Sequence, residues 1–327
     1  MMSSQTVRRA VRVTIVAVVI VALVFFVFRV NWAQTWSAIR ASSPAILVLA
    51  ALVNMLSLAL KAVRWWLFLR AAGSPSLRLA LRATVAGAAL NNILVANAGE
   101  AARVVMVARS SGLPSETVLA TLALERLFEF AGYVVMFAVA IGVLPLPAPL
   151  AEMRPWALGV AALLLATLVY LARQPHRIDA TPLAPTGVPG RMAQYGRGFL
   201  RALTGVSTAR RFTKAMAISV VVWGLQIATY QLTARAAGFA IPIAGTVAAI
   251  LAVNIGFAVR VTPGNVGVFQ AIYAMTAVAF GMDADVAVGV GLLIQTQQIL
   301  PVTLIGLVAA PEAMRTTAAN PAAAGGA

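Results

Sequence analysis

Long, largely apolar runs, each about as long as a lipid bilayer is thick, constrain this chain more than any other feature. The run 11–28 has 18 residues, or about 27 Å as a helix, and the hydrocarbon core of a bilayer is about 30 Å thick. Comparable runs cover residues 44–69, 116–143, 156–172, 215–237 and 286–309. Lipid offers backbone groups no hydrogen bonds, so such runs must be helical. We therefore predict an all-α, polytopic membrane helix bundle.

Composition excludes several other classes of protein. The chain is 61% hydrophobic and 10% charged, whereas soluble domains are about 25% charged. It has no Cys and a single His176, which excludes disulfides and argues against a metal centre. Its net charge of +16 is concentrated beside the apolar runs, as in the cytoplasmic loops of membrane proteins. We expect neither a nucleic-acid partner nor a cofactor.

The distribution of basic residues predicts the orientation in the membrane. Arg8, Arg9 and Arg12 lie at or before the start of the first run and place the N-terminus in the cytoplasm of a cell-membrane protein. No small-residue cleavage motif follows that run, so we expect a retained anchor helix. The segment 173–214 carries eight Lys or Arg against one acidic residue, Asp179. Counting the crossings also assigns this segment to the cytoplasm.

The connections beside the second run are predicted to lie at the membrane surface. Residues 31–43 form an external loop in this interpretation. The last turns of the second run carry basic and aromatic residues, which favour an interfacial anchor cluster whose long cations reach toward water. These residues are Lys61, Arg64, Trp65, Trp66 and Arg70.

A polar stretch at residues 90–129 interrupts the apolar pattern. The apolar arm 79–96 ends among asparagines, a break follows at Asn97-Ala-Gly-Glu, and a short helix runs from Glu100 to about Ser110. That second arm is about 15–17 Å long by helical rise, too short to cross. A re-entrant helical hairpin fits it better than two spans.

A second hairpin is predicted near residue 262, and it makes the two halves of the chain alike. The arm 243–261 ends at Thr262-Pro-Gly-Asn, and a shorter arm, 266–280, returns. One odd crossing separates repeats at 44–143 and 215–309, so the repeats should have inverted topology. The prediction is about six full spans and two re-entrant hairpins in a single domain, 1–310, followed by a disordered tail, 311–327.

Both breaks are candidate anion sites. Asn97 can cap the second arm of the first hairpin, with Glu100 three residues on. Thr262 is the corresponding candidate cap, and Pro263 would occupy the first helical position. Exposed N–H groups at such helix starts favour an anion. The alternative is that both are simply well-formed helix starts.

The charged side chains inside the predicted span 116–143 allow two interpretations. Glu125 and Glu129 are four residues apart and share a helix face, while Arg126 and Glu129 are three apart and can pair. Either these residues brace the helices, or Arg103 or Arg126 contacts a phosphate while a glutamate sets the local charge. Arg260 could likewise either contact a headgroup or brace the helices. Glutamines are predicted to hydrogen-bond between helices, at Gln270, Gln295, Gln297 and Gln298.

The predicted substrate-binding residues combine both breaks with these charges. They are Asn92, Asn97, Gly99, Glu100, Arg103, Glu125, Arg126, Glu129, Asn254, Arg260, Thr262, Pro263, Gly264 and Gln270.

Several short motifs in a fixed order resemble a known family. They are Lys61-x-x-Arg64-Trp65, then Asn92 with Gly99-Glu100-x-x-Arg103, Glu125-Arg126, and Thr262-Pro-Gly-x-x-Gly267-Val268. With these motifs, residues 11–309 resemble the lysylphosphatidylglycerol synthase transmembrane-domain family of prokaryotic membrane proteins.

The resemblance implies a flippase-type fold with two re-entrant hairpins. In synthase members this fold moves an aminoacylated phosphatidylglycerol to the outer leaflet. Their soluble aminoacyl-transferase domain has no counterpart in this sequence, so synthase activity is not expected. The family often has Glu where Gln270 stands and Arg where Gln295-Thr296 stands. We therefore expect a weaker charge network in the second half.

The sequence favours a transporter that moves an anionic or phosphate-bearing lipid between leaflets. The alternatives are a carrier for a small soluble anion and a non-transporting membrane scaffold for lipid-modifying enzymes. No nucleophile elbow, zinc-protease motif or P-loop is present, so no enzyme activity is expected. The predicted partners are membrane lipids, either an anionic phospholipid or a lipid-linked phosphate. A homo-oligomer is compatible with the sequence.

Overall fold

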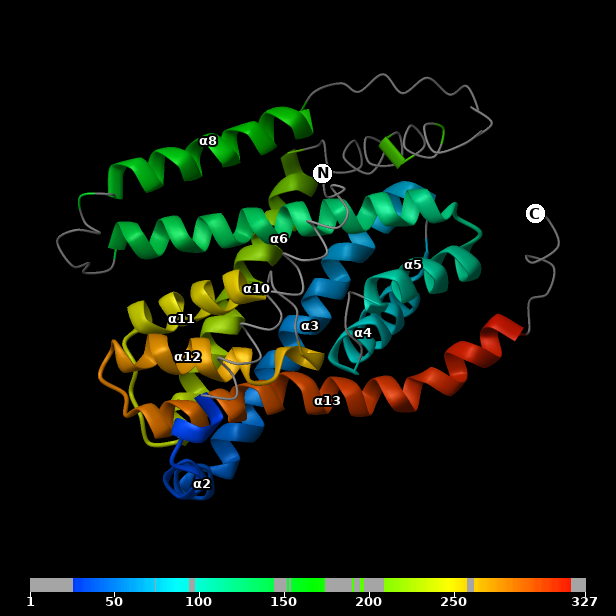
Figure 1. Ribbon diagram of the computed structural model, residues 1–327. Helices are drawn as coiled ribbons and strands as arrows, with labels where there is room; N and C mark the ends of the chain where they lie inside the picture. Colours follow the sequence, from blue (N-terminus) through cyan, green and yellow to red (C-terminus); the bar gives the residue numbers. More distant parts are fainter. Residues whose placement is uncertain are drawn as a thin grey trace, which may run out of the picture. The chain divides into compact units, whose positions relative to one another are not determined.

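The computed structural model is helical in every regular element of the part it describes (Figure 1). The described residues are 26–73, 75–93, 98–143, 152, 154–173, 190, 195–196, 209–257 and 262–318. The helices are α2 (Trp32–Ala41), α3 (Pro44–Gly73), α4 (Leu77–Ile93), α5 (Ala98–Ser111), α6 (Ser115–Val143), α8 (Arg154–Arg173), α10 (Ala209–Ala236), α11 (Ile243–Gly256), the 3₁₀ turn η1 (Pro263–Asn265), α12 (Val268–Val278) and α13 (Ala284–Ala318).

Three of the described helices are long and apolar enough to cross a membrane, namely Pro44–Gly73, Arg210–Ala236 and Ala284–Gly306. The first exposes Leu52 (61%) and Leu56 (51%). Soluble proteins rarely expose large contiguous apolar surfaces. The chain is therefore a membrane-embedded helical protein.

The chain divides into two compact units. Unit 1 comprises residues 1–51, 91–96 and 227–300, and unit 2 comprises residues 52–90, 97–226 and 301–327.

In unit 2, the core forms where α3, α5 and α6 bury aromatic and branched side chains. The rings of Phe68 and Phe128 lie 5.2 Å apart, and both residues are fully buried. The indole of Trp65 is also fully buried and donates to the hydroxyl of Thr121 at 3.0 Å. Buried indoles normally need such a partner. Helices α6 and α8 run side by side at the edge of this unit (Figure 1).

In unit 1, α11 and α12 form a closely packed pair of short helices (Figure 1). The rings of Phe257 and Phe269 lie 6.0 Å apart. A Cβ added at Gly256 would lie 2.1 Å from Ile272 Cδ1, so the close approach of α12 depends on a residue without a side chain.

The predicted external loop 31–43 contains the helix α2. Its N-cap is Asn31, whose side-chain oxygen accepts from the Gln34 backbone N–H at 3.2 Å. The Asn31 backbone N–H donates to Asp285 Oδ1 at 2.9 Å, and Gln34 Nε2 donates to Asp283 Oδ1 at 3.0 Å. Capping and these contacts within unit 1 explain an ordered helix where only a connection was predicted.

Other boundaries also differ from the sequence-based ones. Helix α10 begins at Ala209, so the last residues of the basic segment 173–214 are helical. Helix α13 continues through Pro311 to Ala318, into the predicted tail. Most of the first apolar run, 11–28, lies outside the described residues.

Candidate functional site

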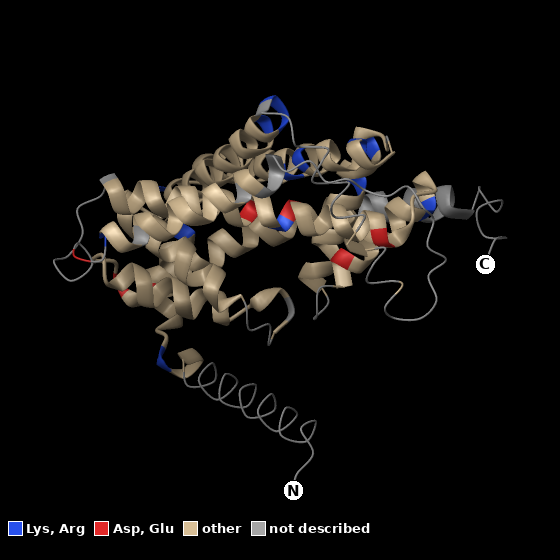
Figure 2. Cartoon of the chain, turned by 90° about the horizontal axis from the view of Figure 1, so that it is seen from above, with Lys and Arg blue, Asp and Glu red and all other residues tan. Residues whose placement is uncertain are grey.

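Charged side chains from α3, α5 and α6 form a network of ion pairs in unit 2, in an inner and an outer group. Figure 2 shows how sparse acidic residues are among the helices. The members of the network are Lys61, Arg64, Glu100, Arg103, Glu125, Arg126 and Glu129. Four cations against three carboxylates leave one excess positive charge, and it lies with the buried Arg64 and Arg103 around Glu125. Lys61 and Arg126 balance Glu100 and Glu129.

The inner part of the network is buried. Glu125 accepts from Arg103 Nη2 at 2.7 Å, and Arg64 Nη2 lies 3.9 Å from its other oxygen. Arg64 is fully buried and donates to the Ser219 hydroxyl at 2.8 Å. The Arg103 guanidinium stacks 4.0 Å above the Trp65 ring. These contacts offset the desolvation of the charges and hold the inner residues as a brace.

A glycine in α4 makes room for Arg103. A Cβ added at Gly87 would lie 2.5 Å from Arg103 Cγ and 2.8 Å from the carbonyl oxygen of Gly99. Only a residue without a side chain lets α5 approach α4 this closely. Gly99, a predicted site residue, therefore lies buried in the α4–α5 contact.

The outer part of the network is partly exposed. Lys61 Nζ lies 3.0 Å from Glu129 Oε1, and Arg126 Nη1 lies 2.7 Å from Glu129 Oε2. Arg126 also pairs with Glu100. The side chain of Arg126 is 53% exposed and that of Glu100 31%. The predicted pairing of Arg126 with Glu129 is thus confirmed, and Arg126 is the accessible cation.

The predicted interfacial cluster at the end of the second run is wrong for two of its members. Arg64 and Trp65 are fully buried in the core of unit 2. Arg70 is exposed and stacks 4.8 Å above the Trp66 ring, which is compatible with the predicted position at the interface. The spacing of Arg64 from Lys61 could have indicated that Arg64 belongs to the charge network, because residues three apart share a helix face. In the structure that face meets the glutamates of α6.

In unit 1, a glutamine pair stabilises the turn before α12. Gln270 accepts from the Gly267 backbone N–H at 2.7 Å and donates to Gln295 of α13. Gln295 in turn donates to the carbonyl oxygen of Gly264 at 2.8 Å. The predicted hydrogen bonding between helices is confirmed at these two glutamines.

The predicted helix start at Thr262 and Pro263 is wrong in detail. Pro263 begins the 3₁₀ turn η1, and α12 begins later, at Val268. The Thr262 hydroxyl donates to the carbonyl oxygen of Val266 at 2.8 Å and does not cap the helix. The positive φ of Gly264, +59°, interrupts the helical path because it is a left-handed conformation.

The remaining predicted residues are dispersed. In unit 1, the carbonyl oxygen of Asn92 would lie 3.3 Å from a Cβ added at Gly264, so the end of α4 adjoins the η1 turn. Asn254 donates to the carbonyl oxygen of Ile250 in its own helix at 2.8 Å. Asn97 and Arg260 lie outside the described residues. The charged candidates that the structure describes thus gather in unit 2, and the described candidates of the second break belong to unit 1.

This arrangement suits binding of an anion by ionic contacts. Arginine and lysine side chains recognise phosphate oxygens, arginine through two parallel hydrogen bonds. Among the residues that the structure describes, no group of His, Cys, Asp and Glu could hold a metal ion.

Comparison with known proteins agrees with the motifs. No curated protein matches the chain. The model of the family described as "Lysylphosphatidylglycerol synthase TM region" matches residues 13–306, which is most of the chain and includes both units' candidate residues. The chain belongs to the lysylphosphatidylglycerol synthase transmembrane-region family.

Proposed function

We propose that this protein is a membrane transporter that moves an anionic or phosphate-bearing lipid between leaflets. The observation that carries the proposal is the graded charge network of unit 2. Its inner ions are buried, whereas Arg126 remains 53% exposed on α6. An intramembrane ionisable group at an accessible position is a functional candidate by default.

The partners of Arg126 suggest how a headgroup binds and leaves. Glu100 and Glu129 neutralise Arg126 when no lipid is present. A lipid phosphate competes with these carboxylates for the guanidinium, and Lys61 on Glu129 adds a second cation. Conduction through a site requires binding strong enough for entry and weak enough for release. Exchange of one anionic partner for another meets that requirement.

The short helix pairs support the transporter architecture that the proposal needs. Helices α4, α5, α11 and α12 have 17, 14, 14 and 11 residues. By helical rise the longest is about 25 Å, short of a hydrocarbon core of about 30 Å. We propose that α4–α5 and α11–α12 are re-entrant hairpins of an inverted repeat. The proposed setting is a cell membrane, with the N-terminus in the cytoplasm.

An apolar groove favours a lipid over a small soluble anion as substrate. The groove lies between α6 and α8, and aromatic and aliphatic side chains line it. A carrier for a soluble ion gains nothing from such a surface, whereas a lipid carrier must accommodate acyl chains. The groove begins one helical turn after Arg126 on the same helix.

Reconstitution of the full chain into liposomes with headgroup-labelled phosphatidylglycerol tests the proposal. Arg126→Ala and Glu100→Ala should abolish transfer, because the first removes the accessible cation and the second leaves it misplaced. Arg70→Ala is the matched control, since Arg70 is an exposed cation of α3 that stacks on Trp66 outside the network. It should transfer lipid at the normal rate.

Two results would count against the proposal. Normal transfer by both the Arg126 and the Glu100 variants would refute the site. A folded wild-type protein that transfers no lipid would favour the scaffold interpretation.

A further inference from the structure

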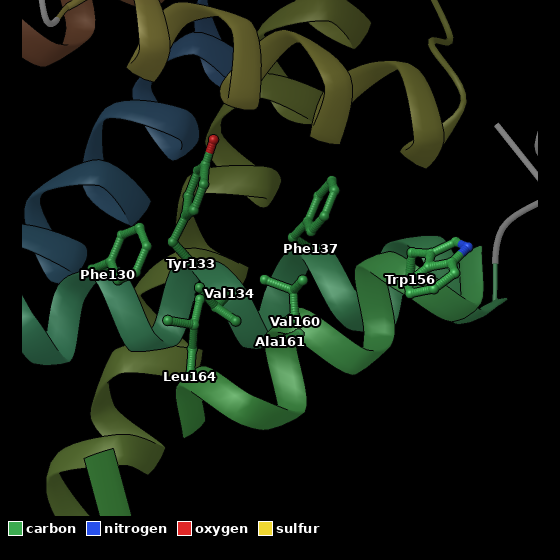
Figure 3. Close-up of a pocket in the computed structure, with 8 residues that line it drawn as sticks. All are labelled: Phe130, Tyr133, Val134, Phe137, Trp156, Val160, Ala161 and Leu164. Carbon is green, nitrogen blue, oxygen red and sulfur yellow. The ribbon is translucent and has the colours of Figure 1, made fainter. Parts of the chain in front are cut away.

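A groove of about 390 Å³ lies between α6 and α8 in unit 2, outside the charge network (Figure 3). Its volume falls within the range of about 300–1,000 Å³ for ligand pockets. The lining residues are Phe130, Tyr133, Val134, Phe137, Trp156, Val160, Ala161 and Leu164. Val134 and Leu164 meet between the two ribbons in Figure 3, and Tyr133 and Phe137 lie on one side of α6.

The groove and the accessible cation lie on one face of α6. Residues three, four, seven, eight and eleven positions apart share a helix face. Phe130, Tyr133, Val134 and Phe137 stand in that relation to Arg126. The apolar face therefore continues directly from the charged turn toward the C-terminal end of α6.

A contact with α10 joins the groove to the charge network. The Tyr133 ring, which lines the groove, lies 5.2 Å from the Trp223 ring. The Trp223 indole donates to the backbone carbonyl of Glu129 at 3.0 Å. Trp223 thus contacts both the groove wall, at Tyr133, and the charged turn, at Glu129.

The length of the groove matches one leaflet of a bilayer. From Arg126 to Phe137 the rise along α6 is about 16 Å, and half of a hydrocarbon core is about 15 Å. A headgroup at Arg126 would place its acyl chain along this face over about the depth that a chain occupies in a leaflet.

The outer rim of the groove is open to the surroundings of the helix pair. Trp156 is 78% exposed, Val160 57% and Phe130 52%. In a membrane-embedded chain such a rim faces acyl chains, so a chain can enter from the side.

We propose that the α6–α8 groove binds one acyl chain of the lipid whose phosphate contacts Arg126. This inference rests on the proposed function. It adds a binding site for the lipid's acyl chain to the proposed headgroup site at Arg126. A lipid bound this way points its tail toward the C-terminal end of α6. Because Arg126 lies eleven residues after the start of α6, about 16 Å by helical rise, the headgroup would lie near the middle of the membrane and the tail in the leaflet where α6 ends.

Photolabelling of the full chain in liposomes tests the groove without depending on transport. The probes are phosphatidylglycerol and phosphatidylcholine, each with a photoreactive diazirine near the end of one acyl chain. Labelled peptides from residues 130–137 and 156–164 are expected with phosphatidylglycerol. Arg126→Ala should lower this labelling by at least about tenfold, because the headgroup contact is lost.

A variant that fills the groove tests its role in transfer. Val160→Trp places an indole in the groove at an exposed position and should slow transfer of long-chain phosphatidylglycerol by about tenfold or more. Val139→Trp is the matched control, since Val139 is 58% exposed on the opposite face of α6. It should leave transfer unchanged, and size-exclusion profiles establish that both variants are folded.

Each outcome decides between the two proposals. Labelling elsewhere than the groove, labelling of the groove by phosphatidylglycerol that Arg126→Ala does not lower, or normal transfer by the Val160 variant overturns the acyl-chain inference. Labelling of the groove that depends on Arg126, in a protein that transfers no lipid, supports the binding groove and rejects the transport function.

Discussion

Glu125 is the residue on which the inner part of the charge network depends. It is 5% exposed and contacts two buried arginines, Arg64 and Arg103. The Nε atoms of both arginines are buried without a hydrogen-bond partner among the described protein atoms. Two guanidinium groups therefore share one carboxylate in a place where solvation is weak.

The substitution Glu125→Gln should destabilise the protein by about 3–5 kcal/mol, because it leaves buried cations without a counter-charge. Thermal unfolding in detergent, followed by tryptophan fluorescence, measures the effect. Glu100→Gln provides the comparison, since Glu100 is 31% exposed in its ion pair and should cost less than about 1 kcal/mol. Equal effects of the two substitutions would show that the inner ions are not a brace.

At the scale of elements, the network exists because α4 and α5 pack closely enough for Arg103 to reach α6. The point of closest approach is Gly87, where an added Cβ would lie 2.8 Å from the Gly99 carbonyl oxygen. A backbone atom cannot move aside to make room for the added Cβ, whereas the end of a flexible side chain can.

The substitution Gly87→Ala should therefore destabilise the α4–α5 pair by about 1–3 kcal/mol through overpacking. Gly224→Ala in α10 is the control, because no atom lies within 4 Å of its added Cβ. A helical Gly→Ala change without a clash should be neutral or stabilise by about 0.5–1 kcal/mol. Hydrogen exchange of α5 amides provides the local readout, and unchanged protection in the Gly87 variant would contradict the close packing.

At the scale of the whole molecule, the basic segments predict one orientation in the membrane. Residues 173–214 should face the cytoplasm and α2 the outside. The chain has no cysteine, so single cysteines report sidedness without background.

Ser37→Cys in α2 should react with a membrane-impermeant thiol reagent in intact cells, because Ser37 is exposed and predicted to be external. Thr181→Cys, in the basic segment, should react only after the cells are permeabilised. The reverse pattern would show that the predicted orientation is inverted.

The sequence by itself determined the class of protein and much of its element order. Long apolar runs require helices in a membrane, and the matched family confirms the interpretation of the motifs. The spacing of Arg126 and Glu129 predicted their ion pair, because helical periodicity is a local property. Asn97 and Arg260, two further candidates, lie outside the described residues.

Only the tertiary structure decided which charges are buried. Arg64 and Arg70 lie on the same helix, yet one is fully buried and the other is exposed. Their surroundings come from α5, α6 and α10, and a sequence pattern along one helix contains no information on what packs against it. Burial depends on contacts between distant segments of the chain. It therefore distinguishes the buried Arg64 and Arg103 from the accessible Arg126, which residue type and spacing alone cannot do.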